Sequence, residues 1–408
     1  MSNKSATGNP FNIIVIVAAL GYFVDIYDLI LFGIVMKPSL KDIGIPEEQI
    51  FDIGGSLLGI QMIGMLVGGI VWGILGDKKG RLSTLFLTIL LYSLANIANG
   101  FVQNIEQYKI MRFIAGFGLA GELGVGITLV SEVMTKESRG IGTSIVAGVG
   151  ILGAVLGFLV ADLFDWRMAY WVGGGLGLLL LIMRISVYES GMFEKTKQST
   201  VSRGNFLSLF SSGKNIKKYL LCILIGVPVW YVISQLTVQS SAYAKELNIT
   251  GEIVGGKAVM FHYIGASLGS LIFGLLSEKL RSRKKALFAA TGSLAIFIAC
   301  YFFMNEISAN MFYVIIGLLG ISMGGLWTVF MANASEQFGT NIRSTVTTTA
   351  PNFVRGTTEL IRISIGSMRG SMGLWSAGLI IGVAVILISL VSIFMSEETH
   401  GKDLDYNE

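Results

Sequence analysis

The chain has 408 residues, of which 53% are hydrophobic and only 14% charged, and its formal net charge is +4. Soluble domains carry about 25% charged residues, so this composition excludes an ordinary soluble domain. The small positive charge lies mainly in loops and does not favour a nucleic-acid partner. The two cysteines, Cys222 and Cys300, fall in apolar stretches. We therefore expect neither a disulfide framework nor a metal site.

Apolar stretches long enough to cross a bilayer recur twelve times along the chain. The predicted spans are 11–36, 54–75, 83–101, 107–134, 140–163, 168–189, 218–243, 255–280, 285–303, 310–333, 345–367 and 372–396. A longer polar segment separates the sixth span from the seventh, which predicts an all-α membrane protein in two halves. The predicted units are an N-terminal six-helix bundle (1–189), a cytoplasmic linker (190–217), a C-terminal six-helix bundle (218–396) and a solvated cytoplasmic tail (397–408).

Basic residues concentrate in the loops on the side that carries both termini. The positive-inside rule then predicts a multi-pass protein of the cell membrane with both termini in the cytoplasm. The first apolar stretch is too long for a signal-peptide core, so we expect it to be retained as the first helix.

Two loop motifs occur twice, about 200 residues apart. GILGDKKGR (73–81) matches GLLSEKLRS (274–282), and SEVMTKESR (131–139) matches SEQFGTNIR (335–343). The repetition indicates that one six-helix unit was duplicated. Duplicated halves of this kind place a substrate path at their interface.

Two carboxylates, Asp25 and Asp28, lie within the first span, three residues apart and therefore on one helix face. An ionised Asp at the bilayer centre costs roughly 3 kcal/mol, so this face must meet partners or a water-filled cavity. Both are candidates for carrying a coupling proton, and the alternative is a fixed buried salt bridge. Glu122 is either a second protonatable group or a carboxyl that ties its helix to a neighbour.

The span 345–367 carries Asn352, Arg355, Glu359 and Arg362 at steps of three, four and three, which places them on one face. Glu359 can neutralise one arginine and leaves about one positive charge over. A guanidinium binds a carboxylate or phosphate through two parallel hydrogen bonds. The stripe is therefore a candidate site for an anionic substrate, and the alternative is an internally satisfied network that only packs helices.

The seventh span offers Tyr231, Gln235 and Gln239 at steps of four, and His262 is the only histidine inside a span. These side chains are candidates for substrate hydrogen bonds, and the histidine for a proton relay. The alternative is polar contact between helices, which is common in membrane proteins.

Several motifs resemble those of the major facilitator superfamily. They are GDKKGR (76–81), DIYD (25–28), RFIAGFGLAGELGVGITLVSEV (112–133), YESGMFEKT (188–196) and ETHGKDL (398–404). The second and third are similar to those of proton-coupled metabolite symporters. The resemblance implies two pseudo-symmetric six-helix bundles, alternating access, and helices one and four lining a central cavity. It favours Asp28 over Asp25 as the proton carrier and implies a contact of Arg112 with either Asp28 or Asp25.

The repeated loop motifs contain acids as well as cations. Loop charge of the positive-inside kind explains the lysines but not these acids. We expect the charged residues to latch the cytoplasmic gate: Asp77, Arg81, Glu132, Arg139, Glu278, Glu336 and Arg343.

These observations predict a proton-coupled symporter for a small organic anion, such as a carboxylate or an acidic sugar. The alternatives are a proton antiporter that exports a drug or metabolite, and a sugar or phosphate symporter. The loops are too short for the recognition domain of a receptor, and the sequence lacks the nucleophile and phosphate-loop motifs of an enzyme. We expect a monomer in the lipid bilayer, with protons as the coupling ion and no other cofactor.

Overall fold

The computed structural model describes residues 13–79, 81–121, 139–189 and 212–402. Apart from one isolated β-bridge between Thr250 and Ser308, the regular elements in these ranges are helices. They are α1 (Ile13–Asp42), α2 (Glu47–Lys79), α3 (Arg81–Asn99), α4 (Ile105–Leu119), α6 (Arg139–Ile151), α7 (Gly153–Leu163), α8 (Trp166–Glu189), α9 (Gly213–Tyr231), η3 (Val232–Thr237), α10 (Ser240–Glu246), α11 (Gly255–Leu280), α12 (Arg283–Phe303), α13 (Ala309–Gln337) and α14 (Thr340–Met395).

Nine helices in the described ranges are long and apolar enough to cross a membrane. The last two predicted spans both lie in α14. The two spans are separated by a sharp bend at Gly373, where φ is 81°. Glycine adopts this left-handed conformation without the steric penalty of a side chain. The predicted spans 83–101 and 107–134 correspond to α3 and α4, whose described parts are shorter. The prediction of twelve membrane-crossing helices is confirmed.

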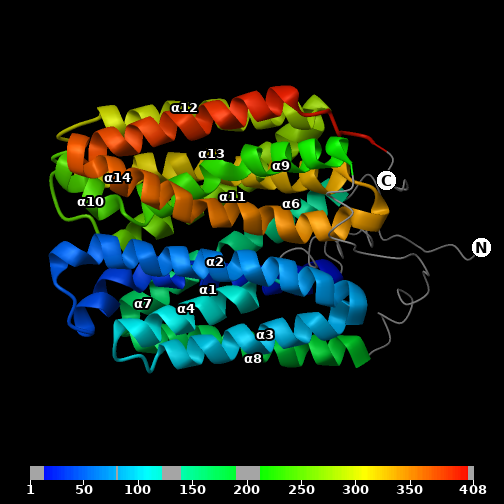
Figure 1. Cartoon of the computed structure of the whole chain (residues 1–408), viewed down its shortest axis with the longest axis horizontal. Coiled ribbons are helices and arrows are strands. Elements are labelled where there is room, and N and C mark those ends of the chain that lie inside the picture. Colours follow the sequence, from blue (N-terminus) through cyan, green and yellow to red (C-terminus); the bar gives the residue numbers. More distant parts are fainter. Residues whose placement is uncertain (1–12, 80, 122–138, 190–211, 403–408) are drawn as a thin grey trace, which may run out of the picture.

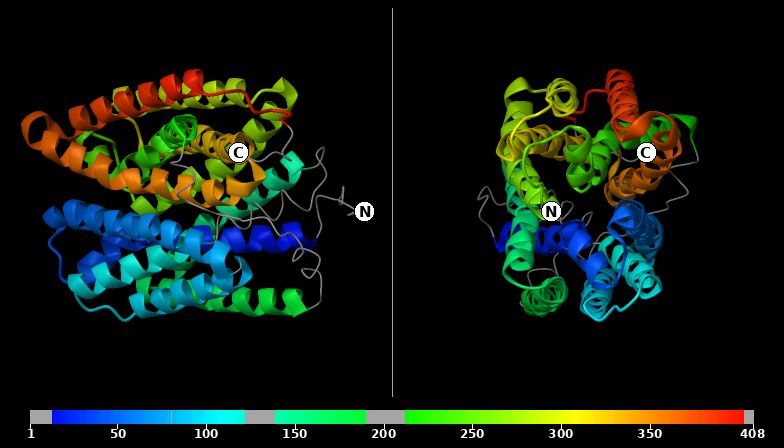
Figure 2. Two further views of the ribbon diagram at one scale, coloured as in Figure 1. Left: turned by 45° about the vertical axis from the view of Figure 1, so that its right-hand side comes forward. Right: turned by 90° about the vertical axis from the view of Figure 1, so that its left-hand side faces the viewer.

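The helices form two layers that lie side by side (Figure 1). One layer contains α1, α2, α3, α4, α7 and α8, and the other contains α9 to α14, with α6 beside α11 (Figure 1). Two further views show the same division (Figure 2). Helix α1 begins and α14 ends at one end of the molecule, which we call the terminal end; the other is the opposite end.

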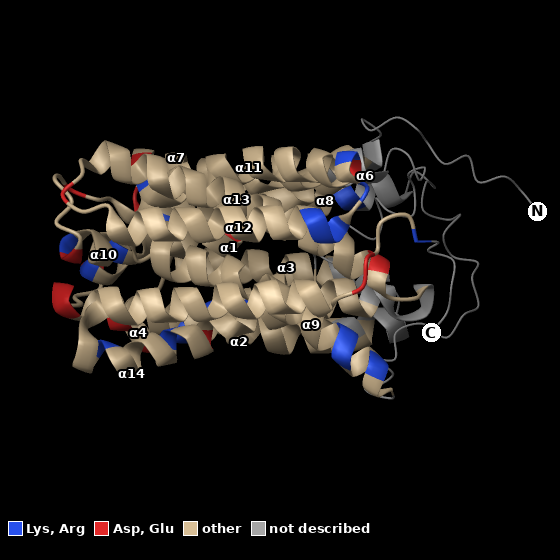
Figure 3. Cartoon of the chain, turned by 90° about the horizontal axis from the view of Figure 1, so that it is seen from above, with Lys and Arg blue, Asp and Glu red and all other residues tan. Residues whose placement is uncertain are grey.

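Charged residues gather at the two ends, and most of the band between them carries none (Figure 3). Large apolar side chains such as Leu163 and Phe394 are exposed, whereas Arg112, Asp28 and His262 are buried. A soluble protein rarely exposes so much apolar surface. The distribution is that of a protein whose outer surface meets lipid.

The two halves meet along α2 and α14, and along α11 with α6 and α7. Gly59 of α2 allows the first of these contacts, since a side chain there would collide with the carboxylate of Glu359 on α14. Small residues commonly permit such close approach between membrane helices. The polar face of α14 therefore packs against the N-terminal half.

Candidate functional site

Arg355 lies at the interface between the halves and is only 2% exposed. Its Cζ is 5.9 Å from the centre of the Trp230 ring on α9 and 5.7 Å from that of Trp327 on α13. Its Nη1 donates to Oδ1 of Asn352, one turn earlier, at 2.8 Å. Aromatic faces attract a cation, and the attraction grows when water is excluded. Helices α9, α13 and α14 thus hold one guanidinium between two indole rings.

Two hydrogen-bond donors at this point have no acceptor among the described residues. They are Nε of Arg355 and Nε1 of Trp230, and both are buried. Buried donors in folded proteins are nearly always paired, so each exception needs an explanation. A carboxylate is the acceptor that a guanidinium binds best. The pair of donors is therefore chemically suited to an anion.

The N-terminal half contributes to the same place through α1. The indole Nε1 of Trp327 donates to the hydroxyl of Tyr22 at 3.2 Å, which joins the two halves. Asp25 lies three residues after Tyr22 and so on a neighbouring part of the same helix face. Arg355 interacts electrostatically with Asp25, with Tyr22 and with Tyr263 of α11. The structure thus brings the predicted Asp25 and Arg355 to one site.

The other members of the stripe on α14 have partners. Asn352 donates from Nδ2 to the Ala120 carbonyl of the N-terminal half at 3.0 Å. Glu359 and Arg362 form a two-point ion pair, with Nε–Oε2 at 2.9 Å and Nη2–Oε1 at 2.6 Å. Because Glu359 occupies the fork of Arg362, Arg355 is the arginine of this stripe with donor capacity left over.

Arg112, the expected partner of Asp28 or Asp25, is fully buried within the N-terminal half. It donates to the side-chain oxygens of Asn99 at 3.1 Å, Asn96 at 3.1 Å and Gln61 at 3.5 Å. Its Cζ also lies 4.9 Å from the centre of the Tyr170 ring on α8. All three nitrogens of this guanidinium are therefore hydrogen-bonded to neutral amides.

Asp28 is also buried, and its carboxylate packs against Gly173 of α8, where a side chain would collide with it. Gly173 follows Tyr170 by three residues, so Asp28 and Arg112 meet the same turn of α8. The neighbouring Tyr27 donates to the Ala169 carbonyl of α8 at 2.8 Å. Asp28 is thus turned toward the interior of its own half. Its direct contact with Arg112 stays a prediction.

The seventh span is interrupted by the π-helix η3, which sequence analysis missed. The hydroxyl of Tyr231 donates to the Gly378 carbonyl at 2.6 Å, and Nε2 of Gln235 donates to Ser234 at 3.3 Å. Nε2 of Gln239 donates to the Phe51 carbonyl of α2 at 3.2 Å. The contacts of Tyr231 and Gln239 join different helices, whereas that of Gln235 stays within η3. Such π-helical turns are frequent at functional sites. Gln239 differs from the other two because it crosses between the halves.

His262 of α11 is fully buried, and its Nδ1 is 3.1 Å from the hydroxyl oxygen of Thr237 in η3. The contact joins two helices of the C-terminal half. This is the structural role that the sequence analysis kept as the alternative to a proton relay.

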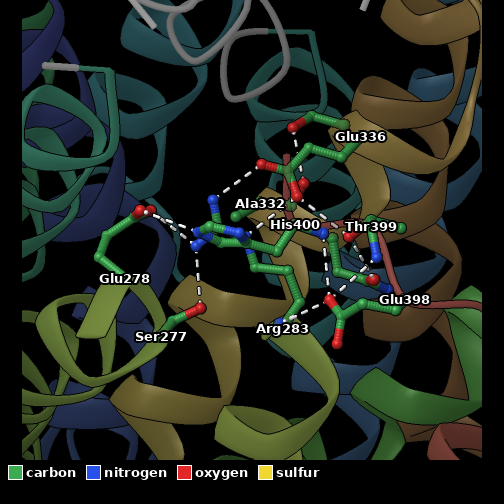
Figure 4. A network of polar contacts seen from close by, with 10 residues as sticks. Ser277, Glu278, Arg283, Ala332, Glu336, Glu398, Thr399 and His400 are labelled. Atoms are coloured by element: carbon green, nitrogen blue, oxygen red, sulfur yellow. Dashed lines mark hydrogen bonds and ion pairs between the residues drawn. The ribbon is translucent and has the colours of Figure 1, made fainter. Parts of the chain in front are cut away.

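A charged cluster lies at the terminal end of the C-terminal half (Figure 4). Arg283 is at its centre and donates to Glu278 at 2.7 Å and to Glu336 at 2.8 and 3.0 Å. The predicted latch acids Glu278 and Glu336 are therefore brought together, and Arg283 is the cation that joins them. The side chain of Arg343, another predicted latch residue, lies outside the described residues.

The tail after α14 docks onto this cluster, which corrects the expectation that it is simply solvated (Figure 4). Glu398 accepts from the backbone N–H groups of Arg283, Thr399 and His400 at 2.8 to 3.0 Å, and from the hydroxyl of Ser282. Partial burial opposes ionisation of Glu398, but these hydrogen bonds outweigh it and lower its pKa to about 2. The anionic carboxylate pins the tail to the start of α12.

The remaining latch predictions cannot be placed. Glu132 lies outside the described residues, and so do the side chains of Asp77, Arg81 and Arg139. Glu122, which was predicted as a protonatable group and not as a latch, also lies outside them. At the opposite end, Arg369 of α14 pairs with Asp52 of α2 at 3.3 Å and lies over the Phe51 ring. This ion pair between the halves was missed because neither residue lies in a repeated motif.

Trp230, Tyr22 and Arg283 were also missed. A signal existed for Trp230, because tryptophan usually lies at membrane interfaces, and this one falls near the middle of the predicted span 218–243. Arg283 carried no signal that separated it from the other loop cations. No group of three or more His, Cys, Asp or Glu in the described ranges is placed to hold a metal ion.

The sequence profile of the Major Facilitator Superfamily matches residues 18–355. The chain is 24% identical over 397 residues to a probable 4-methylmuconolactone transporter of Cupriavidus pinatubonensis, which covers 93% of this chain and 89% of the relative. It is 27% identical over 407 residues to the cis,cis-muconate transport protein of Acinetobacter baylyi, which covers 94% of each. Its fold is similar to that of the proton:xylose symporter XylE, with a TM-score of 0.73 and 16% identity, covering 96% of this chain and 97% of that one. The chain therefore belongs to the major facilitator superfamily of membrane transporters.

Proposed function

We propose that this transporter is a proton-coupled symporter that takes up a small organic carboxylate by alternating access. The observation that carries the proposal is the Arg355 guanidinium, buried between Trp230 and Trp327 with its Nε unpaired among the described residues. Because a buried cation needs an acceptor, this donor set supports an anionic substrate. The indole rings support one with a flat, unsaturated body.

The relatives support the same substrate class. Cis,cis-muconate and 4-methylmuconolactone, after which two of the relatives are named, are small unsaturated organic acids. The similarity to a xylose symporter rests on fold and does not favour a sugar. The orientation follows from the basic loops: the terminal end would face the cytoplasm of a cell-membrane protein.

Two ion-pair clusters support gating at the two ends. The Arg369–Asp52 pair would close the outer end by joining α14 to α2. The cluster around Arg283 would brace the cytoplasmic end of the C-terminal half. Exposed ion pairs contribute about 0–1 kcal/mol, so the outer pair can break readily during the cycle.

Binding to the purified protein tests the proposal. Benzoate and cis,cis-muconate should raise the melting temperature at pH 6, whereas xylose and inorganic phosphate should not. Arg355→Gln should weaken carboxylate binding at least about 100-fold, because the positive charge and its hydrogen bond to the substrate are lost together. Arg362→Gln is the matched control, since Glu359 already occupies that fork; it should bind within about threefold of the natural chain.

The proposal fails if xylose stabilises the protein and the carboxylates do not. It also fails if Arg355→Gln binds carboxylates as tightly as the natural chain while Arg362→Gln loses them.

A further inference from the structure

The two carboxylates of α1 have different surroundings. Asp28 packs against Gly173 of α8, inside the N-terminal half. Asp25 is one turn from Tyr22, whose hydroxyl accepts a hydrogen bond from Trp327 of the C-terminal half. At 100° per residue, Asp25 is about 60° around the helix from Tyr22, and Asp28 about 120°. Asp25 is therefore the acid nearer to the face that meets the other half.

Arg355 is on the other side of that meeting point. It lies over the ring of the same Trp327 and interacts electrostatically with Asp25. Both side chains are nearly inaccessible, at 2% exposed for Arg355 and 6% for Asp25. A buried ionised group is strongly disfavoured unless a charge of opposite sign accompanies it. Asp25 and Arg355 are the opposite charges that approach this meeting point from the two halves.

We infer that Asp25 and the carboxylate of the transported anion are alternative counter-charges of Arg355, so that one monoanion is carried with one proton and no net charge. This inference rests on the proposed function and assigns the coupling step to one residue. It reverses the preference for Asp28 that the family resemblance suggested.

The charges balance at each step. Before binding, the site holds Arg355 as a cation and Asp25 as an anion. The substrate carboxylate then accepts hydrogen bonds from Nε of Arg355 and Nε1 of Trp230. Asp25 loses its counter-charge and takes one proton from water on the open side. The loaded site holds a cation, an anion and a neutral acid, so it is again neutral.

Among the residues that the structure describes, the other charged and titratable groups nearby leave this role to Asp25. Tyr22 and Tyr263 are phenols, which are neutral near pH 7. On α14, Glu359 is one turn from Arg355 and is paired with Arg362. On α1, Asp28 is one turn from Asp25 and meets the turn of α8 that also contacts Arg112.

Proton uptake on binding tests the inference. The dissociation constant of benzoate is measured by calorimetry from pH 5 to 8.5, in buffers of different ionisation enthalpy. The natural chain should take up about one proton, so its dissociation constant should rise about tenfold per pH unit above the pH at which Asp25 titrates. Asp25→Asn should remove this dependence. It should also bind benzoate at least about tenfold tighter than the natural chain at pH 8, because the competing carboxylate is gone.

Asp28→Asn is the comparison variant and should keep the tenfold slope even where its affinity is lower. The inference is overturned if Asp28→Asn loses the slope and Asp25→Asn keeps it. It is also overturned if folded Asp25→Asn binds benzoate more weakly than the natural chain at every pH. Absence of binding by the natural chain would instead contradict the proposed function.

Transport by proteoliposomes gives an independent readout. A pH gradient, acidic outside, should drive benzoate uptake, whereas a potential imposed with potassium and valinomycin should change the initial rate by less than about twofold. A rate that follows the imposed potential would show net charge movement and would overturn the one-to-one exchange.

Discussion

Arg112 and Arg355 are both buried arginines of a membrane protein, yet their surroundings are opposite. Arg112 donates from all three nitrogens to the amides of Asn96, Asn99 and Gln61, within one half. Arg355 donates to Asn352, lies near two indole rings of the C-terminal half, and has no acceptor for its Nε among the described residues. Every nitrogen of the Arg112 guanidinium therefore donates a hydrogen bond, whereas Nε of Arg355 is left to bind another group.

On the proposed function, this difference separates a structural cation, Arg112, from a substrate-binding cation, Arg355. Hydrogen bonds to a charged group stabilise a fold by about 1.5–3 kcal/mol each, whereas an unpaired buried donor costs free energy. Arg112 therefore holds α2, α3 and α4 together. The unpaired Nε of Arg355 costs free energy in the empty site, as the proposed function expects of a donor kept for a ligand.

The largest expected effect is on stability. Arg112→Met leaves three buried amide oxygens without their donor and should lower the free energy of unfolding by about 3 kcal/mol or more. Arg355→Met removes one hydrogen bond to Asn352, and Asp25 can take up a proton once its counter-charge is gone, so the melting temperature should fall clearly less than that of Arg112→Met. Thermal unfolding of both variants in the same detergent, without substrate, measures the difference. A larger fall for Arg355→Met would contradict the assignment.

A smaller effect separates the two indoles beside Arg355. Trp230→Phe removes the N–H that has no acceptor among the described residues and should weaken benzoate binding about tenfold, as for one hydrogen bond to a charged group. Trp327→Phe removes an N–H that already donates to Tyr22, so binding should change less than about threefold. Calorimetry at pH 6 measures both. Equal losses would mean that the rings contribute by stacking alone.

The smallest effect concerns the docked tail. Because the pKa of Glu398 is lowered to about 2 in the folded chain, its stabilising effect is complete above the ordinary value near 4.5 and is lost as the pH falls from there toward 2. Amide hydrogen exchange of residues 397–402, corrected for the intrinsic rate, should show protection at pH 6 that disappears in this range. Glu398→Gln should lack the protection already at pH 6. Protection that persists in Glu398→Gln would show that other contacts hold the tail.

Much of the architecture was predictable because hydropathy is a local property. Each stretch near 20 apolar residues must form a helix in lipid, since water is not there to pair the backbone. The face shared by Asn352, Arg355, Glu359 and Arg362 also followed from spacing alone. Spacing did not reveal that Arg362 is the paired arginine, because Glu359 lies within one turn of both.

The contacts between helices were harder to predict from the sequence. The spacing indicated Tyr231, but its neighbour Trp230 is the residue that contacts Arg355. Successive residues of a helix project about 100° apart, so an error of one position selects a different face. Glu278 and Glu336 were recognised as a pair of repeated acids, but their shared partner Arg283 depends on how α11, α12 and α13 converge.

The sequence by itself determined that this chain crosses a membrane in two duplicated halves and buries a few charges, because lipid penalises each polar group wherever it lies in the fold. The tertiary structure decided that every nitrogen of Arg112 donates a hydrogen bond and that Nε of Arg355 has no acceptor among the described residues. That distinction depends on partners brought from helices far apart in the chain, such as Tyr22 with Trp327 and Asp25 with Arg355, and no local pattern encodes the rotation and crossing of those helices.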